Sequence, residues 1–426
     1  MSDQHMILYR NMEHQALFDG MSALLTGDEE NMAGIDSYAL AGELIELAGS
    51  YGFEGNLWHC FLALCLARHE NAYSTACEIK GDQGGTLSLM AAHDMAVFRR
   101  LYQADLAMLD VYEGKGIWTE LQRFEPVNGS GHVFNKRIRD RIIELSKTLE
   151  KAADTAAFQK AVAGFYAEFG VGKFGLNKAF RIKEAGAEAS IEPIVNVEHV
   201  YLNDIVGYEL QKQKLIENTE AFLAGRPANN CLLFGDAGTG KSSSIKAILN
   251  TYYDKGLRII EVYKHQFHAL SSVLEQIQDR NYRFIVYMDD LSFEESELEY
   301  KYLKAIIEGG LGRRPGNVLI YATSNRRHLI REKFSDKREL DDELHVNDTV
   351  QEKLSLVARF GVQIYYGSPD KKQFQNIVRV LADKYGVVMP EEQLLAEANK
   401  WELQHGGLSG RTAIQFINHL LGTAEN

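Results

Sequence analysis

Proline, long apolar runs and positive charge are all scarce in this sequence. Its six prolines argue against long disordered linkers. No stretch approaches the ~18 uninterrupted apolar residues of a membrane helix, and the start lacks the apolar segment of a secretory signal peptide. The formal net charge is -13, so the chain as a whole is not a polycation that binds nucleic acid. We therefore expect no membrane contact, and a nucleic-acid role would require a local basic patch.

Cysteine is also rare, and its spacing matches neither a zinc site nor a redox motif. The four residues are Cys60, Cys65, Cys77 and Cys231. The first two lie five residues apart in an apolar, helix-like run, which is typical of buried thiols. Nothing suggests a disulfide framework, so the sequence predicts a reducing environment and a cytoplasmic location.

The length of 426 residues indicates two or three domains, because one domain has typically ~100–200 residues. Apolar residues recur at intervals of three and four through most of the first 170 residues, which predicts helices. We expect an all-α domain over 1–185, with a boundary in the glycine-containing joint of 170–200. The purpose of this domain is open, and binding of a partner is one possibility. Apolar strands alternate with helices over 186–367, and 368–426 is predicted to be a small helical lid.

Residues 231–243 read CLLFGDAGTGKSS and match the phosphate-loop pattern G-x-x-x-x-G-K-[ST]. Glycines let consecutive backbone N–H groups turn inward as an anion cradle, and a following helix adds its positive end. The residues expected to bind nucleotide here are Gly235, Asp236, Ala237, Gly238, Thr239, Gly240, Lys241, Ser242 and Ser243. Lys241 can reach the phosphates, and the hydroxyl of Ser242 can bind Mg²⁺. The alternative is a glycine-rich turn without a ligand; the apolar strand before it and the helix expected over 243–253 favour nucleotide binding.

Two further strands end in polar side chains that suit such a site. The apolar strand of 284–288 runs into Asp289 and Asp290, which we assign to the metal and to the attacking water. An acidic turn without a function is the alternative. The strand of 317–322 leads to Asn325, which can sense the γ-phosphate or can merely cap a turn. Because ligands of parallel α/β sheets bind at the carboxyl ends of the strands, we expect these side chains to meet.

Basic residues gather only in the segment 313–338. They are Arg313, Arg314, Arg326, Arg327, Arg331, Lys333, Lys337 and Arg338. This segment could contact nucleic acid, an acidic partner or a neighbouring subunit's nucleotide, or it could be a solvated face paired with nearby acids. Arg359 lies between a helix expected over 350–358 and a strand over 362–366. Arg411 falls in the first turn of a helix capped by Ser409, where a cation opposes the helix dipole and calls for an anion such as a bound phosphate or a carboxylate.

The ordered set GDAGTGKSS, FIVYMDD, YATSN, ARFG and GLSGR resembles the motifs of AAA+ ATPases over 200–426. In wording such as DDLSFE and YATSNRRHL, the chain is more closely similar to an uncharacterised, mainly bacterial family of AAA+-like proteins, described as a domain of unknown function. The resemblance implies a parallel sheet with helices on both faces, and ATP and Mg²⁺ as ligands. No guanine-reading motif follows the third strand.

Carried over residue by residue, the resemblance implies a role for each motif position. Lys241 and Ser242 would bind phosphate and Mg²⁺, Asp289 would bind Mg²⁺, and Asn325 would be sensor 1. Arg411 would be sensor 2. The remaining implied sites are Arg359, as a finger acting on a neighbour's ATP, and Ile205 and Gly207, in the loop near the adenine.

Two departures from the AAA+ pattern qualify these roles. The second acid is usually glutamate, whereas this chain has Asp290, whose carboxylate is set back by one methylene. Hydrolysis could therefore be slow. A long charged stretch, 327–352, also separates sensor 1 from Arg359, so Arg326, Arg327 or Arg338 could serve as the finger instead.

Three functions are compatible with the sequence. The first is an oligomeric ATPase that moves or remodels a protein partner, and the second is a slow ATP-dependent switch. The third, which ranks behind them, is a nucleic-acid-associated loader ATPase that uses the segment 313–338. The sequence does not name the substrate or the size of the oligomer.

Overall fold

The computed structural model describes residues 5–27, 34–113, 116–126, 134–185, 188–293, 299–308, 315–325 and 356–423. The chain divides into two compact units, Met1–Asn177 and Lys178–Asn426. This division falls before the boundary expected near residue 185. The reason is that Ala179–Ala185 form strand β1, which pairs with β4 (Leu257–Glu261) and so belongs to the sheet of the second unit.

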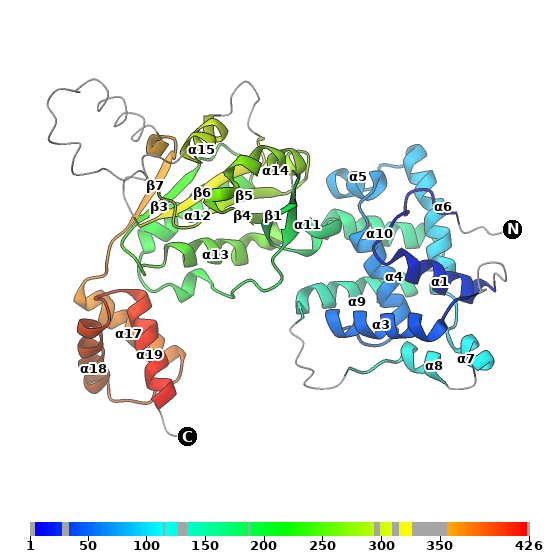
Figure 1. Cartoon of the computed structure of the whole chain (residues 1–426), viewed down its shortest axis with the longest axis horizontal. Helices are drawn as coiled ribbons and strands as arrows, with labels where there is room; N and C mark the ends of the chain where they lie inside the picture. The colour runs from blue at the N-terminus through cyan, green and yellow to red at the C-terminus, as the bar shows by residue number, and fades with distance from the viewer. Residues whose placement is uncertain are drawn as a thin grey trace. The chain divides into compact units, whose positions relative to one another are not determined.

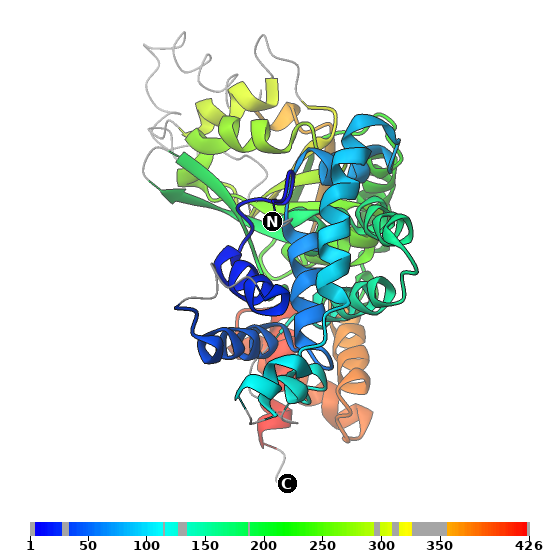
Figure 2. The ribbon, with the colours of Figure 1, turned by 90° about the vertical axis from the view of Figure 1, so that its right-hand side faces the viewer.

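The described part of the first unit is helical, with one isolated β-bridge between Gly55 and Phe124. Its helices are α1 (Gln15–Thr26), α3 (Ser37–Tyr51), α4 (Leu57–Arg68), α5 (Ala72–Lys80), α6 (Gly85–Tyr102), α7 (Ala107–Glu113), α8 (Ile117–Gln122), α9 (Lys136–Glu150), α10 (Thr155–Phe169) and α11 (Gly172–Leu176). Helix α4 is buried over nearly its whole length because its sequence, LWHCFLALCLAR, is apolar all round. It runs beside α6 (Figure 2).

All four cysteines are free and buried. Burial raises the pKa of the Cys60 thiol to about 12 and that of Cys77 to about 11. These thiols are therefore protonated packing groups near neutral pH. Among the described residues, no helix combines the length and apolar character needed to cross a membrane.

The second unit contains a sheet whose described strands lie in the order β2-β1-β4-β5-β6-β3-β7. The strands not yet defined are β2 (Glu188–Pro193), β3 (Cys231–Gly235), β5 (Arg283–Met288), β6 (Val318–Ser324) and β7 (Val362–Tyr366). All neighbours are parallel except β1 and β2, which form an antiparallel hairpin. The predicted α/β fold with a parallel sheet is confirmed. The hairpin at the sheet edge was not predicted, because its sequence had been interpreted as a joint.

Helices cover both faces of this sheet, as Figure 1 shows. Helices α12 (Glu209–Leu223) and α13 (Lys241–Tyr252) share one buried core with β3 and its neighbours, whereas α14 (Leu270–Ile277) and α15 (Glu299–Glu308) lie over the other face. Short 3₁₀ turns, η1 (Leu202–Asp204), η2 (Tyr253–Lys255) and η3 (Lys264–Ala269), complete the connections. The central strands are buried on both sides, which explains their continuous apolar sequences.

Beyond β7, the chain forms three helices with a small core of their own. They are α17 (Lys371–Lys384), α18 (Glu391–Gln404) and α19 (Gly410–Thr423). Asp370 begins α17 with a capping box, in which its carboxylate accepts a hydrogen bond from the backbone N–H of Gln373. Phe374 of α17 and Phe416 of α19 are both buried in this core. We call these helices the lid.

Candidate functional site

The phosphate loop joins β3 to α13 and depends on glycine for its shape. Gly235 has a φ of 132°, and a Cβ there would stand 2.1 Å from the carbonyl oxygen of Tyr366. Gly240, with a φ of 93°, leads directly into Lys241, the first residue of α13. Within the loop, the Thr239 hydroxyl donates to the carbonyl of Asp236 at 2.8 Å. The positive end of α13 therefore faces the loop, as an anion site requires.

The ammonium group of Lys241 bridges the loop to the neighbouring strand β6. Its Nζ lies 2.9 Å from the carbonyl oxygen of Gly235, 2.6 Å from that of Asp236, and 2.9 Å from Oδ1 of Asn325. Three N–H bonds thus have three acceptors. The side chain is buried, and desolvation lowers its pKa despite the nearby carboxylates of Asp236, Asp290 and Asp289.

Three hydroxyl groups converge on one carboxylate oxygen at the end of β5. Oδ1 of Asp289 accepts from Ser242 Oγ at 2.7 Å, from Tyr287 OH at 2.7 Å and from Thr323 Oγ1 at 2.5 Å. Desolvation disfavours the ionised form of Asp289, but the hydrogen bonds from these hydroxyls outweigh it and lower its pKa. Asp289 is therefore a carboxylate fixed beside the first turn of α13.

The next residue, Asp290, is exposed and has a left-handed backbone, with a φ of 48°. Its N–H donates to Thr323 Oγ1 at 3.0 Å, and its Oδ1 accepts from Nδ2 of Asn325 at 2.8 Å. Asn325 thus contacts Lys241 with one end of its amide and Asp290 with the other. The three side chains form a continuous polar chain across the carboxyl ends of β3, β5 and β6.

The segment between β7 and α17 and the start of α19 each contact the phosphate loop. Oδ2 of Asp236 accepts from the N–H of Ser368 at 2.7 Å and from its hydroxyl at 2.8 Å, and these bonds lower the pKa of the Asp236 carboxyl. The backbone N–H of Arg411 donates to the carbonyl of Gly238 at 3.2 Å. A Cβ on Gly238 would stand 3.0 Å from Cβ of Arg411 and 3.0 Å from Oγ of Ser409. The loop and the start of α19 therefore pack without room for a side chain.

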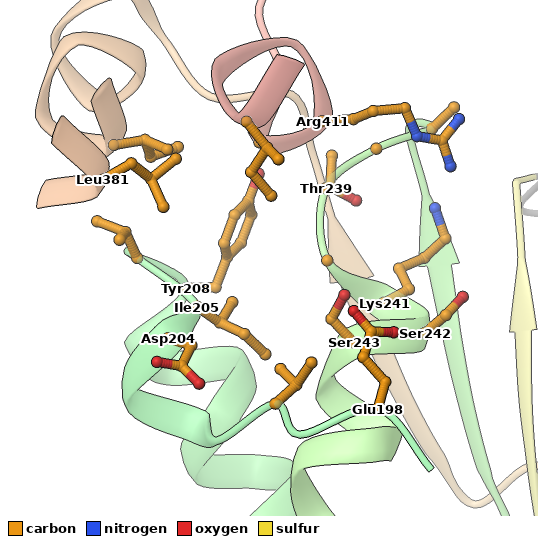
Figure 3. A pocket seen from close by; sticks show the side chains of 18 of the residues that line it. Glu198, Asp204, Ile205, Tyr208, Thr239, Lys241, Ser242, Ser243, Leu381 and Arg411 are labelled. Atoms are coloured by element: carbon orange, nitrogen blue, oxygen red, sulfur yellow. The ribbon is translucent and has the colours of Figure 1, made fainter. Parts of the chain in front are cut away.

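A cavity of about 670 Å³ opens between the loop, the segment 198–208 and the lid. Figure 3 shows Ile205, Tyr208 and Leu381 on one side of it, and Lys241 and Ser242 on the other. One end is therefore apolar and the other is polar and cationic. Lys384 of α17 forms an ion pair with Asp204, with Nζ 2.5 Å from Oδ1, beside the apolar end.

Most of the site residues predicted from the sequence line this one cavity. Those that do are Ile205, Ala237, Gly238, Thr239, Gly240, Lys241, Ser242, Ser243, Asp289, Asp290, Asn325 and Arg411. Gly235 and Asp236 begin the loop, and Gly207 lies in the chain segment that carries Ile205 and Tyr208; none of the three is a lining residue. The cavity thus gathers residues that are distant in the sequence.

Sequence reasoning missed the apolar end of the cavity and the hydroxyls behind Asp289. The missed lining residues include His199, Val200, Ile377, Leu381, Tyr385 and Ile414. Ile377 and Leu381 are four residues apart, so a helical interpretation of α17 could have paired them on one face. Tyr287 stands two residues before Asp289, and strand periodicity puts both side chains on the same face of β5.

Arg359 lies away from the cavity. It precedes β7, which runs parallel to β3 with Val362 opposite Cys231. Arg359 therefore lies at the end of the sheet where β3 begins. The phosphate loop lies at the opposite end, where β3 ends, about 16 Å further along a strand of this length. The whole segment 327–352 and every basic residue singled out between 313 and 338 lie outside the described residues.

The fold and the site define a class of protein. A phosphate loop follows the strand β3, and the ends of β5 and β6 supply acidic and polar side chains beside it. The helical lid packs against the loop. The protein is an AAA+-like P-loop protein. Its sequence over residues 176–424, more than half of the chain, matches the family described as "Protein of unknown function (DUF815)", and the chain belongs to this family.

Solved structures give weaker similarities. The AAA domain of FIGL-1 in complex with ADP shares 16% identity at a TM-score of 0.36, over 54% of this chain and 75% of that chain. Two mutants of RuvB from Thermotoga maritima each share 13% identity over 52% of this chain and 73% of theirs, with TM-scores of 0.34 and 0.33. No curated protein matches the chain. The fold assignment rests on the strand order and the phosphate loop.

Proposed function

We propose that this protein is an ATPase that binds ATP with Mg²⁺, hydrolyses it within an oligomer, and uses the cycle to remodel or move a protein partner. The observation that supports hydrolysis best is the pair of contacts at the polar end of the cavity. Ser242 meets Asp289 there, and Asn325 joins Lys241 to Asp290. A phosphate-binding lysine, a hydroxyl–carboxylate pair and a second acid are the groups that phosphoryl transfer to water needs.

The cavity suits a nucleotide along its length. The phosphates would lie on the backbone N–H groups of the loop, where Lys241 can exchange an acceptor such as Asn325 for a phosphate oxygen. The base would pack among the apolar side chains at the other end, including Ile205 and Leu381. The guanidinium of Arg411, next to the loop, would add charge to the phosphate end.

The donor set also fits Mg²⁺. The Ser242 hydroxyl and the Asp289 carboxylate are hard oxygen ligands within 2.7 Å of each other, and Mg²⁺ in nucleotide sites retains most of its remaining ligands as water and phosphate oxygen. Among the described residues, no cluster of three or more His, Cys, Asp or Glu side chains forms a metal cage. This pattern suits an ion that arrives with the nucleotide. Bound there, Mg²⁺ would neutralise charge on the phosphates.

Hydrolysis requires a group that orients water, and we assign that role to Asp290. Its exposed carboxylate faces the polar end of the cavity and is held by Asn325. Arg359 and the phosphate loop of the same chain lie at opposite ends of the strand β3. Arg359 would therefore act on the ATP of a neighbouring subunit, which makes catalysis dependent on assembly. A partner of unknown identity would be engaged by the helices of the first unit.

A slow nucleotide switch is the second candidate, and one observation favours it. Asp290 stands where the usual residue is glutamate, and its Oδ1 already accepts a hydrogen bond from Asn325. A water molecule held by Asp290 could therefore react slowly. A nucleic-acid-associated role would depend on the basic segment 313–338. It would show as stimulation of turnover by DNA or RNA and a steep loss of binding with salt. The net charge of -13 counts against it.

The decisive experiment follows ATP turnover per subunit as protein concentration rises, with molecular mass recorded in parallel. We expect specific activity to climb as the mass shifts to a multimer. If ATP binds but turnover stays negligible at every mass, the switch replaces the ATPase. If a Lys241→Ala variant binds ATP as tightly as the native chain, the cavity itself is misassigned.

A further inference from the structure

Asp289 has two side-chain partners besides Ser242, and neither was assigned a role at the nucleotide site, although both lie within the stretches FIVYMDD and YATSN. They are Tyr287, two residues earlier on β5, and Thr323, on the adjacent strand β6. Both side chains are almost fully buried, with exposed fractions of 5% and 1%. Buried hydroxyls in a packed sheet have few alternative rotamers, so they restrict the position of the oxygen that they bind.

The sheet register explains why these hydroxyls reach the same oxygen. Strand side chains alternate, so Tyr287 and Asp289 point to the same face. Strands β5 and β6 pair Met288 with Ala322, so the next residues along, Asp289 and Thr323, lie side by side where the strands end. This geometry is built into the sheet and does not depend on a ligand.

Thr323 also connects the two acids. Its Oγ1 donates to Asp289 and accepts from the N–H of Asp290, and its carbonyl accepts from the N–H of Leu291 at 2.7 Å. These bonds hold the left-handed turn at Asp290, a conformation that costs energy for most residues but that aspartate tolerates. A single threonine therefore binds the carboxylate of Asp289 and fixes the backbone that carries the carboxylate of Asp290.

We propose that Tyr287 and Thr323 are positioning residues that orient the Asp289 carboxylate for the metal–nucleotide complex, with Thr323 aligning Asp290 as well. This inference rests on the proposed function, because it presumes that Asp289 contacts a divalent cation. Outer groups that orient a metal ligand typically contribute ~10–100-fold to metal affinity. Removing either hydroxyl should therefore lower the affinity for the metal ion while leaving the phosphate loop and the base pocket intact.

The test uses the full chain and Mn²⁺ as a spectroscopic probe. Binding of Mn²⁺ in the presence of a non-hydrolysable ATP analogue is measured by electron paramagnetic resonance for the native chain, Tyr287→Phe and Thr323→Val. We expect roughly tenfold weaker Mn²⁺ binding in each variant. Binding of a fluorescent ATP analogue in EDTA should be unchanged, since the loop glycines and Lys241 keep their own contacts in both variants. Thr323→Ser keeps the hydroxyl and should restore Mn²⁺ binding.

Tyr321→Phe is the matched control. Tyr321 lies opposite Tyr287 in the register of β5 and β6, is equally buried, and directs its hydroxyl to Asn218 and Thr219, away from Asp289. Its variant should bind Mn²⁺ like the native chain.

Separate outcomes distinguish the inference from the function beneath it. Native-like Mn²⁺ binding in both Tyr287→Phe and Thr323→Val overturns the positioning role, and so does an equal loss in Tyr321→Phe. If Thr323→Val fails to fold, the Mn²⁺ affinity of Tyr287→Phe decides. If Tyr287→Phe fails to fold, the Mn²⁺ affinity of Thr323→Val decides, with Thr323→Ser as the variant that keeps the hydroxyl. If the native chain binds the ATP analogue but its complex with the analogue takes up no Mn²⁺, the metal assignment in the proposed function fails, and the inference fails with it.

Discussion

Replacing Asp290 by asparagine should separate chemistry from structure at this site. Asparagine keeps an oxygen that can accept a hydrogen bond from Nδ2 of Asn325, and its backbone N–H can still donate to Oγ1 of Thr323. It also tolerates the φ of 48° at this position. The variant should therefore fold with native stability, within about 0.5 kcal/mol, as most exposed substitutions do. Only the negative charge that would orient and polarise water is lost.

The expected loss of turnover is large. Proton transfer by a positioned side chain contributes typically ~10²–10⁴-fold, which is about 3–5 kcal/mol of barrier at 1.36 kcal/mol per factor of ten. Single-turnover hydrolysis measures it, with binding of a fluorescent ATP analogue and the unfolding midpoint as controls for Asp290→Asn. Turnover above roughly a tenth of the native rate would refute the assignment of Asp290 to the water. Asp290→Glu should not raise the rate, because glutamate tolerates the left-handed turn less well.

Three further predictions concern other parts of the second unit. Arg359→Ala should lower assembled turnover by ~10³-fold or more while ATP binding persists; loss of binding would contradict its role in trans. Gly235→Ala should lower the unfolding free energy measured by urea titration by more than about 4 kcal/mol, because its Cβ would meet the Tyr366 carbonyl at 2.1 Å. Gly256→Ala, at a φ of 88° and with open space around its Cβ, should cost only the ~1–2 kcal/mol of the left-handed backbone, and equal losses would exclude the steric explanation. Finally, the folded-state pKa of Asp289 lies below its ordinary value of 3.8, so the stability that its ionised form contributes is full above that pH and is lost as pH falls through the folded value. The difference in unfolding free energy between the native chain and Asp289→Asn should thus be larger at about pH 6 than at about pH 3, and a constant difference would disprove the linkage.

The strands of the α/β core could be predicted from the sequence because each one is a short apolar run between turn signals. The strand predicted at 362–366 coincides with β7, and that at 284–288 lies within β5 (Arg283–Met288). The hairpin of β1 and β2 escaped prediction. Its residues alternate apolar and charged types, as in FRIKEA, and the sequence gives no local sign that β1 would pair with a strand more than 70 residues away.

The polar half of the candidate site could be anticipated, whereas the apolar half could not. Phosphate chemistry requires particular residue types at fixed spacing, so the loop and the strand ends carry a local signal. The apolar end is lined by side chains such as Leu381, whose identity is ordinary for any helix. Only the folding of the lid over the loop brings them to the cavity. The left-handed turn at Asp290 was likewise invisible, although it gives a physical reason for aspartate where AAA+ proteins usually have glutamate.

The contact between the phosphate loop and α19 limits which sequences the loop can have. Position 238 is one of the four variable places in the G-x-x-x-x-G-K-[ST] pattern, so the motif alone would permit any residue there. In this protein, Ser409 and Arg411 occupy the space that a side chain would need. The loop of this protein therefore cannot be exchanged freely for the phosphate loop of another protein. Its sequence is fitted to a helix about 170 residues further along, and grafting another protein's phosphate loop here would require grafting a compatible lid with it.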